Sequence, residues 1–572
     1  LLAGWFVLLA YEYEQLGKHT AAGAGFISNF AFWRESGYFD NAAETKPLLH
    51  LWSLGIEEQF YVFWPLLVWA TVRSRVSLLA FALVVGAASF AVNVLAVRSD
   101  PVSTFFLPHT RFWELLAGCA LAFAARTFDS HGHPAAVGST VDTWLLKRIT
   151  TLGTAWRRHL ICNVAAWTGA MLILCGLLAL DRTRAFPGWW AALPVTGTFL
   201  VIAAGPRAWF NRIVLSNRLL VFIGLISFPL YLWHWPILSF ARIVESGAPS
   251  GGLRAAAVLI ALLLAWVTYQ VLERPVRFGG HGRAKAAVLV VLMASLGLTG
   301  YYVFRKDGLQ SREIAKRTQQ LTDWRRDQQY TPTTMKGGRI EDLKVLRGQV
   351  SDGVLFIGDS LLGQYYPRAV RAYSREPLPY YSTTFAARNH CHPLPGLDIV
   401  SSPDNINCID YWNAAVALAR SAQFKRIVFG GSWAELNSQN TSQLVAELKS
   451  LRSVGKEIFI IGQSPRTALF DPSNLAGRLR KKALWGDEVV HLSDVFVERQ
   501  AIENVGLQRA LARIAATVDA TLINPFDYLC PEGKCPALVN SSNLYIDDGH
   551  LRASYAAEMA TFIDETIERP RR

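Results

Sequence analysis

The chain has 572 residues, more than one ordinary domain of ~100–200 residues contains. Apolar residues make up 51% of it and charged residues only 18%, below the ~25% of a typical soluble protein, which argues against a purely cytosolic enzyme and against a disordered chain. A net charge of +13 fits either nucleic-acid binding or Lys and Arg in the cytoplasmic loops of a membrane protein. Because the chain is so apolar, we favour the loops and expect no nucleic-acid partner.

The sequence begins inside an apolar run, residues 1–10, which is shorter than the ~20 residues that a membrane span needs. The run lacks the basic start and the small-residue cleavage site of a signal peptide. We interpret it as the end of a transmembrane helix whose beginning is absent from the sequence.

Eight apolar stretches follow before residue 305, and each approaches the length of a membrane span. One such stretch could be a buried core helix, but eight of them predict a polytopic helical membrane domain. The stretches are 59–72, 78–97, 112–125, 160–180, 188–204, 219–241, 255–272 and 286–304.

Lys and Arg in the short loops predict the orientation, because cytoplasmic loops carry an excess of both. They are more numerous on the side that follows 59–72 than on the side that precedes it, so we assign the former side to the cytoplasm. The last span begins at the basic residues Arg283 and Lys285 and therefore leaves the cytoplasm. Everything after Phe304 is expected outside.

Four of the seven cysteines lie in this exported part: Cys391, Cys408, Cys530 and Cys535. Four cysteines in an exported domain fit two disulfides, and we favour Cys391–Cys408 and Cys530–Cys535 because each pair closes a short loop. A zinc site is the alternative, but the spacing matches no usual zinc pattern, so we expect no metal.

Residues 305–350 are polar and basic, and we interpret them as a linker with some helix. From about residue 351, apolar runs at 354–357, 426–429 and 457–461 alternate with helical stretches at 413–420, 443–451 and 501–518. This alternation predicts a three-layer α/β domain with a parallel sheet. The expected organisation is a membrane domain over 1–304, a linker over 305–350 and an α/β domain over 351–572.

The first of these strands runs into Gly358-Asp-Ser360, a tight turn that puts Ser360 at the carboxyl edge of the sheet. Backbone N–H groups at the start of the following helix can bind a developing oxyanion there. A lone serine of this kind is more often a helix cap. However, Asp547 and His550 stand three residues apart near the other end of the domain. His550 can take the Ser360 proton and Asp547 can orient the imidazole, so the three predict a catalytic triad.

With these two motifs the domain resembles the SGNH hydrolase superfamily. The resemblance implies that Ser360 is the nucleophile, His550 the base and Asp547 its partner, with the Ser360 N–H as one oxyanion donor. The central motifs match poorly, because Gly430-Gly-Ser-Trp stands where the family has Gly-x-Asn-Asp and no Gly motif is identifiable. Gly358, Asn389 and Gly431 are the candidate oxyanion-hole residues.

Several ionisable groups of the membrane half lie at positions where an apolar residue would have a lower free energy in the bilayer. Burying the carboxylates of Glu57 and Glu58 unpaired at the edge of a span costs free energy, which favours a functional role. The alternative interpretation is that both carboxylates are solvated among lipid headgroups. Arg111 and Glu114 have the spacing of a helical ion pair. The complete set of candidates is Glu57, Glu58, Arg111, Glu114, His234, Glu273 and Arg274.

The segments 50–65, 110–118, 227–236 and 269–275, which hold these groups, closely resemble the acyltransferase-three family of integral-membrane acyltransferases. The subtype with a fused periplasmic SGNH domain resembles the whole chain. The resemblance implies an O-acetyltransferase of a bacterial surface polysaccharide, especially lipopolysaccharide O-antigen, in the inner membrane. Acetyl-CoA would be the donor, with no bound cofactor, and the polysaccharide and the lipid bilayer would be the partners.

The family resemblance also implies two further spans before residue 1, the first with an Arg and a His. We therefore expect this chain not to transfer acetyl groups by itself. Two other functions remain open: a membrane-tethered SGNH esterase that removes acetyl groups, and a non-catalytic export or scaffold component. The triad does not separate hydrolysis from transfer, but the charged motifs in the spans favour transfer, because a tether needs only one helix. The missing Asn motif slightly favours the scaffold.

Overall fold

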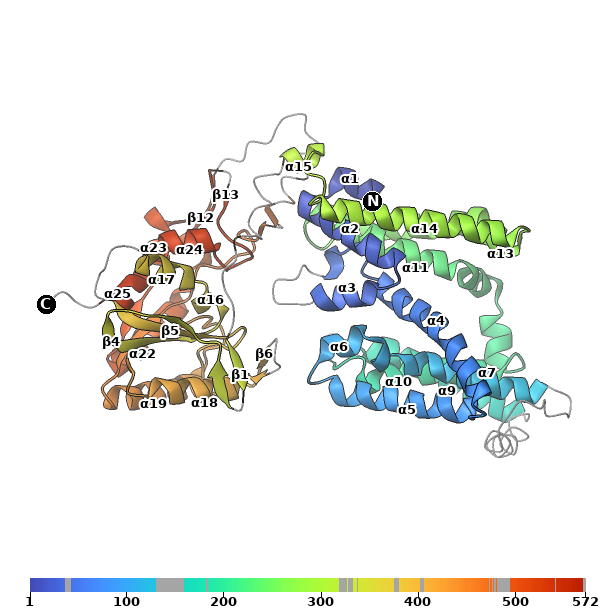
Figure 1. Cartoon of the computed structure of the whole chain (residues 1–572), viewed down its shortest axis with the longest axis horizontal. Coiled ribbons are helices and arrows are strands. Elements are labelled where there is room, and N and C mark those ends of the chain that lie inside the picture. Colours follow the sequence, from blue (N-terminus) through green and yellow to red (C-terminus); the bar gives the residue numbers. More distant parts are fainter. Residues whose placement is uncertain are drawn as a thin grey trace.

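The computed structural model shows a bundle of helices beside an α/β domain (Figure 1). The residues that the structure describes are 1–35, 43–129, 159–181, 184–317, 327, 333–336, 338–374, 380–401, 406–472, 474–475, 477, 480, 494–540 and 542–568. The helical bundle is formed by residues before 306, and the α/β domain by residues after 333.

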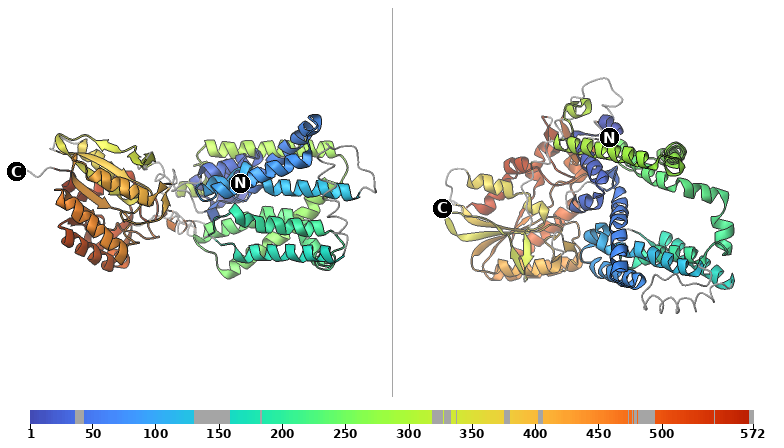
Figure 2. Two further views of the ribbon diagram at one scale, coloured as in Figure 1. Left: turned by 90° about the horizontal axis from the view of Figure 1, so that it is seen from below. Right: turned by 45° about the vertical axis from the view of Figure 1, so that its right-hand side comes forward.

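Several long helices of the bundle lie roughly parallel in the left view of Figure 2. The helices of the bundle are α1 (Leu2–Val7), α2 (Ala10–Ala24), α3 (Ser28–Glu35), α4 (Leu51–Arg73), α5 (Leu78–Ala96), α6 (Pro101–Phe106), α7 (Phe112–Asp129), α9 (His159–Ala179), α10 (Ala192–Ala204), α11 (Arg218–Glu245), α12 (Gly251–Thr268), α13 (Arg274–Phe278) and α14 (Gly282–Arg305). A π-helical turn, Tyr269–Glu273, joins α12 to α13. Small residues let neighbours approach closely: a Cβ at Gly17 of α2 would lie 2.7 Å from the Gly300 carbonyl oxygen of α14.

Within the described residues, five helices rather than the predicted eight are long and apolar enough to cross a membrane. They are Leu78–Ala96, Leu160–Ala179, Arg218–Glu245, Gly251–Phe278 and Gly282–Arg305. The predicted spans at 112–125 and 188–204 correspond to the shorter apolar helices Phe112–Phe123 and Gly188–Ala204 within the described residues. The predicted span at 59–72 is part of α4, whose N-terminal half carries Glu57 and Glu58.

The membrane assignment itself agrees with the surface of the bundle. Large apolar side chains lie exposed on these helices: Leu95 is 80% exposed, Leu178 79% and Leu298 69%. An apolar surface of this extent is stable against lipid and unfavourable in water. The chain is therefore a membrane protein with several spans.

The α/β domain is built on a six-stranded sheet with the strand order β11-β9-β8-β4-β5-β3. These strands are β3 (Lys344–Leu346), β4 (Val350–Gly358), β5 (Tyr381–Ala387), β8 (Phe424–Gly430), β9 (Glu457–Ile461) and β11 (Thr521–Ile523). All neighbours are parallel except β3, which pairs with β5 in the antiparallel sense. The short strands outside this sheet are β1 (Thr334–Lys336), β2 (Arg339–Glu341), β6 (Val400–Ser401), β7 (Ile406–Asn407), β10 (Val495–Glu498), β12 (Lys534–Val539) and β13 (Ser542–Asn543).

Helices cover both faces of this sheet, which confirms the predicted three-layer α/β fold. In β4, Val354 and Phe356 belong to one hydrophobic cluster while Leu355 and Ile357 belong to another, because alternate side chains of a strand point to opposite faces. The helices are α16 (Ser360–Gly363), α17 (Tyr366–Tyr373), α18 (Cys408–Ala419), α19 (Ser438–Ser453), α21 (Arg499–Ile502), α22 (Val505–Val518), α23 (Phe526–Leu529), α24 (Ala553–Met559) and α25 (Asp564–Ile567).

The predicted linker contains more structure than its polar composition indicates. A short helix, α15 (Glu313–Arg317), follows α14, and β1, β2 and β3 all lie before residue 351. Lys344–Leu346 gains its strand conformation by pairing with β5, a partner about forty residues later that local composition does not reveal. The sheet therefore begins inside the segment that we expected to be linker.

Both predicted disulfides are present. Cys391–Cys408 joins the loop after β5 to the first residue of α18, and Cys530–Cys535 joins the end of α23 to β12. Each bond fixes a loop on the α/β domain.

Candidate active site

Ser360 lies where β4 ends and α16 begins, as the sequence predicts. The turn depends on Gly358, because a Cβ at this position would overlap the carbonyl oxygen of Gly430 in the neighbouring strand β8. Asp359, which is buried, caps the helix: its Oδ1 accepts a hydrogen bond from the Leu361 N–H at 2.8 Å. The two strand ends and this cap hold Ser360 at the carboxyl edge of the sheet.

The three residues of the expected triad meet in a chain of hydrogen bonds. His550 Nε2 lies 2.8 Å from Ser360 Oγ, and His550 Nδ1 lies 2.7 Å from Asp547 Oδ2. With Nδ1 donating to the carboxylate, the Nε2 lone pair faces the serine hydroxyl and can accept its proton. The arrangement is that of an activated nucleophile with an oriented base.

The Asp547 carboxylate is held in its charged form. Burial alone would raise the pKa of Asp547, but the hydrogen bond and positive charge of His550, together with the N–H groups of Gly549 and His550, keep that pKa below its ordinary value. The two backbone N–H groups donate to Asp547 Oδ1 at 2.9 and 2.7 Å. The carboxylate is therefore both fixed in position and available to stabilise an imidazolium.

The loop that carries His550 is tied to the helix that carries Ser360. The Leu551 N–H donates to Gln364 Oε1 at 2.7 Å, and Gln364 Nε2 in turn donates to the Leu361 carbonyl at 2.9 Å. Gln364 follows α16 directly and is buried. Base and nucleophile, 190 residues apart in the chain, thus share one rigid support.

The candidate oxyanion-hole residues all lie near this edge but differ in their surroundings. Gly358 pairs with Ala387 of β5 and with Gly430 of β8, so Asn389 and Gly431 each follow a strand that borders β4. Gly431 has a φ of 141°, and a Cβ there would lie 2.6 Å from Asp359 Oδ1. Gly358 and Gly431 thus provide room for close packing, whereas Asn389 places a buried polar side chain at the site.

The backbone N–H groups of the segment that replaces the family's Asn motif are already engaged. The Ser432 N–H donates to Asp359 Oδ2 at 2.8 Å, and the Trp433 N–H donates to Gln463 Oε1 at 2.9 Å. Neither group is directed to a substrate. The Ser360 N–H and the buried residue Asn389 remain the predicted oxyanion donors.

Two histidines beside Asn389 were missed by the sequence reasoning. His392 Nδ1 lies 3.1 Å from Asp359 Oδ2 and 3.1 Å from the Ser432 carbonyl. Burial alone would lower the pKa of His392, but the Asp359 carboxylate raises it above its ordinary value. Burial lowers the pKa of His390, and the neighbouring His392 adds to that effect. The segment Arg388-Asn-His-Cys-His392 carries a signal for both, two histidines beside a predicted disulfide.

The seven ionisable candidates of the helical half do not share a single network of contacts. Arg111 pairs with Glu114 at 2.9 Å, as predicted, and its guanidinium lies over the Trp52 ring. Glu273 pairs with Arg277 at 3.3 Å rather than with Arg274. Glu57 and Glu58 lie together on α4.

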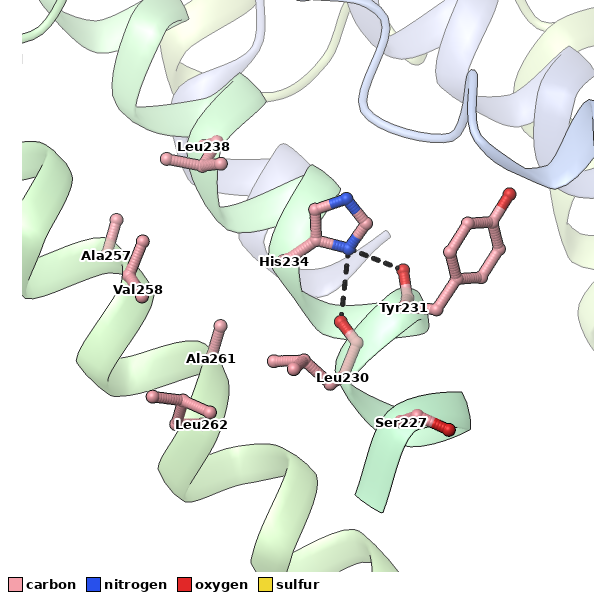
Figure 3. A pocket seen from close by; sticks show the side chains of 9 residues that line it. All are labelled: Ser227, Leu230, Tyr231, His234, Leu238, Ala257, Val258, Ala261 and Leu262. Carbon is pink, nitrogen blue, oxygen red and sulfur yellow. Dashed lines mark hydrogen bonds between the residues drawn. The ribbon is translucent and has the colours of Figure 1, made fainter. Parts of the chain in front are cut away.

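His234 borders a cavity of about 390 Å³ between α11 and α12 (Figure 3). Its Nδ1 bonds to the carbonyls of Leu230 and Tyr231, at 3.1 and 2.9 Å, which leaves Nε2 as the nitrogen directed away from its own helix. The cavity is otherwise lined mainly by aliphatic side chains of the two helices.

His50, which precedes α4, is a second histidine that the sequence reasoning did not single out. Its ring centroid lies 6.2 Å from that of His234 and 5.3 Å from that of Tyr231. The side chain is buried. The Tyr231 hydroxyl donates to the His50 carbonyl at 2.5 Å and fixes the backbone. A signal was present, because His50 opens the same motif as Glu57 and Glu58.

Two protein-family models match the chain. One, described as an acyltransferase domain of the acyltransferase-three type, matches residues 1–270, and the other, described as the SGNH domain fused to such domains, matches residues 329–565.

Curated relatives match about half of the chain. YrhL of Bacillus subtilis, whose name provisionally assigns it as a peptidoglycan O-acetyltransferase, is 29% identical over 48% of this chain and 42% of its own length. The peptidoglycan O-acetyltransferase OatA of Listeria monocytogenes is 27% identical over 45% of this chain and 39% of its own length. The matches thus span about two fifths of these relatives.

Among solved structures, the periplasmic domain of the lipopolysaccharide acetyltransferase of Salmonella ser. Paratyphi A matches with 14% identity and a TM-score of 0.30. The match covers 38% of this chain and 84% of that domain. A TM-score of this size does not establish a common fold.

Proposed function

Because the chain belongs to the acyltransferase-three family in its helical half and carries the SGNH domain that is fused to such domains, we propose that it is an O-acetyltransferase of a bacterial surface polysaccharide. The observation that carries the proposal is the complete Ser360–His550–Asp547 chain of hydrogen bonds at the carboxyl edge of the SGNH sheet. A degenerate scaffold domain has no need of this geometry.

The triad supplies a two-step transfer. Ser360 Oγ attacks the carbonyl carbon of a donor acetyl group while His550 takes the hydroxyl proton and then passes it to the leaving group. A sugar hydroxyl next attacks the acetyl-Ser360 ester, and His550 takes the sugar proton and returns it to Ser360 Oγ. Asp547 stabilises the imidazolium in both steps. The products are an acetylated sugar and the free enzyme.

Both steps pass through a tetrahedral oxyanion, which the Ser360 N–H and the Asn389 side chain would bind. Preorganised donors at such a position are worth ~10²–10³ in rate each. Asn389 fits the role because it is buried beside the nucleophile's strand and replaces the amide that the usual Asn motif would supply.

Acetyl-CoA is the proposed donor, and the helical half would pass its acetyl group across the membrane. Ionisable groups inside an apolar bundle are costly, so their placement favours a functional role. The Arg111–Glu114 pair and the His50–His234 pair are the groups that we assign to this step, since each is held in place by contacts within the bundle. The SGNH domain would lie in the periplasm and the bundle in the inner membrane.

Surface polysaccharides are the proposed acceptors, because both curated relatives are named for peptidoglycan O-acetylation. We place lipopolysaccharide O-antigen first among them, as the family subtype implies. Acyl transfer to a sugar rather than to water needs an acceptor held in a cleft from which water is excluded. The same triad without a bound acceptor would act as an esterase, and experiment separates the two.

The test replaces Ser360 by Ala in the chromosomal gene of the bacterium that carries it. Acetyl groups are then counted by mass spectrometry on purified O-antigen and on peptidoglycan, and Ser442→Ala, an exposed position on α19, serves as the control. We expect the Ser360→Ala strain to lose acetyl groups from one of the two polysaccharides. The control strain should keep them on both. An increase in acetylation would instead identify an esterase, and wild-type acetylation would show that Ser360 takes no part.

A further inference from the structure

The segment 462–480 lies between β9 and β10, and we call it the docking arm. Its described residues contact both the loop that carries Asp547 and His550 and the helical bundle. Its described residues are 462–472, 474–475, 477 and 480. The arm leaves β9 at Gly462, and β9 is separated from β4 only by β8. It therefore starts on the same carboxyl edge of the sheet as Ser360, the side that faces the bundle in Figure 1.

The first half of the arm holds the loop that carries Asp547 and His550. The Thr467 N–H donates to the Asp548 carbonyl at 2.8 Å, and Arg466 Nε pairs with Asp548 Oδ2 at 2.9 Å. The Phe470 ring stacks on the Tyr545 ring with a centroid distance of 3.9 Å, and both rings are buried. The arm thus contacts residues on both sides of Asp547.

The second half of the arm reaches the helical bundle through a buried ion pair. Arg480 is 2% exposed, and its Nη2 lies 2.7 and 2.8 Å from the two carboxylate oxygens of Glu12 in α2. Its Nη1 donates to the Ile243 carbonyl near the end of α11. A buried Arg that bonds a carboxylate with one nitrogen and a backbone carbonyl with another is held at two points, and its bonds to the charged group are among the stronger hydrogen bonds in proteins.

Two further contacts accompany this ion pair. Leu475 is buried in a cluster with Leu9 and Tyr11 of the bundle and with Leu538 of the α/β domain. Gly477 lies against Ser246, the residue that caps α11, so closely that a Cβ at 477 would overlap the serine side chain. An ion pair, an apolar contact and a close backbone approach make this a specific surface.

We propose that the docking arm positions the SGNH active site over the outer ends of α2 and α11. Arg480 is the positioning residue of the arm, and Glu12 is the residue of the bundle that it binds. This inference rests on the proposed function. The arm would present Ser360 to the acetyl group as it leaves the bundle, before the group reaches bulk water. Because the arm contacts the loop of Asp547 and His550, docking of the arm on the bundle also orients the triad.

A cross-link tests the docking without reference to activity. The full chain, with Cys119, Cys162 and Cys175 replaced by Ser, receives Leu475→Cys together with Leu9→Cys, two positions of the buried cluster that the arm shares with the bundle. Mild oxidation in membranes should join the two domains, so that proteolysis between residues 317 and 333 leaves the halves connected until a reductant is added. The control pair Ser442→Cys with Leu9→Cys should not cross-link. Absence of the 475–9 cross-link would overturn the docked arrangement.

Charge exchange tests the positioning role. Introduced into the chromosomal gene, Arg480→Glu and Glu12→Arg should each lower polysaccharide acetylation at least ~10-fold, and the double variant should recover most of it, because the pair is restored in reverse. Hydrolysis of a small activated acetyl ester by the purified full-length protein should stay within ~2-fold of wild type in all three, since a freely diffusing ester needs no docking.

Wild-type acetylation by Arg480→Glu would overturn the positioning role. A parallel loss of acetylation and ester hydrolysis would also overturn it, because that result would indicate damage to the triad. Failure of the proposed function has a different signature. In that case Ser360→Ala would acetylate like wild type while the 475–9 cross-link still formed.

Discussion

His550 Nε2 lies 2.8 Å from Ser360 Oγ, a contact between residues 190 positions apart at the two ends of the SGNH domain. Both residues are buried, and the loop and helix that carry them are joined through Gln364. The contact is thus a fixed feature of the domain and the starting point for a test of the chemistry.

Substitutions in the triad should have graded effects. We expect Ser360→Ala and His550→Ala to abolish acetylation, because these residues make and break bonds. Asp547→Asn should retain a small activity, ~10⁴-fold below that of wild type, since Asp547 only orients the base and stabilises its charge. Rates of acetyl transfer in membranes check this order. Equal activity of Asp547→Asn and wild type would remove Asp547 from the mechanism.

Asn389→Ala should lower kcat for hydrolysis of an activated acetyl ester by ~10²–10³ with little change in KM, because an oxyanion donor acts chiefly in the transition state. Steady-state kinetics of the purified protein measure both constants. Gln439→Ala, at an exposed position on α19, is the matched control. An unchanged kcat would exclude Asn389 from the oxyanion hole.

His392→Gln should remove a pH-dependent part of the stability of the α/β domain. The folded-state pKa of His392 is raised, so its contribution is fully present below the unfolded value of ~6.5 and is lost as pH rises through the folded pKa. Thermal unfolding followed by circular dichroism should thus show a larger deficit of the variant at about pH 5.5 than at about pH 8. A deficit independent of pH would contradict this assignment.

Single cysteines should report the topology. Ser442→Cys, on the exposed face of α19, should react with a membrane-impermeant maleimide in spheroplasts from which the outer membrane has been removed. Gly280→Cys, in the exposed loop before α14, should react only after lysis, because this loop is expected in the cytoplasm. The reverse pattern would invert the orientation of the whole protein.

The local patterns of the sequence were sufficient for the fold class, for the disulfides and for the choice of Ser360, His550 and Asp547 as residues that meet in one chain of hydrogen bonds. Apolar runs alternating with helical stretches determine the α/β architecture, since each strand and helix must bury one face against a neighbour. The disulfides close short loops, and the turn at Gly358 follows from a strand that ends in small and polar residues. Each of these features depends on residues that are close in the chain or on a strong motif.

Only the tertiary structure decided how groups remote in the sequence are used. The Ser432 and Trp433 N–H groups donate to Asp359 and Gln463. Strand β3 forms inside the expected linker by pairing with β5. Within the described residues, five helices rather than the expected eight are long and apolar enough to span a membrane. The tertiary structure also joined Arg480 to Glu12 across 468 positions and set His50 beside His234. Hydropathy and motif spacing act over one helix or turn, whereas a buried hydrogen bond or ion pair exists only once packing has brought its two partners together and excluded water from both.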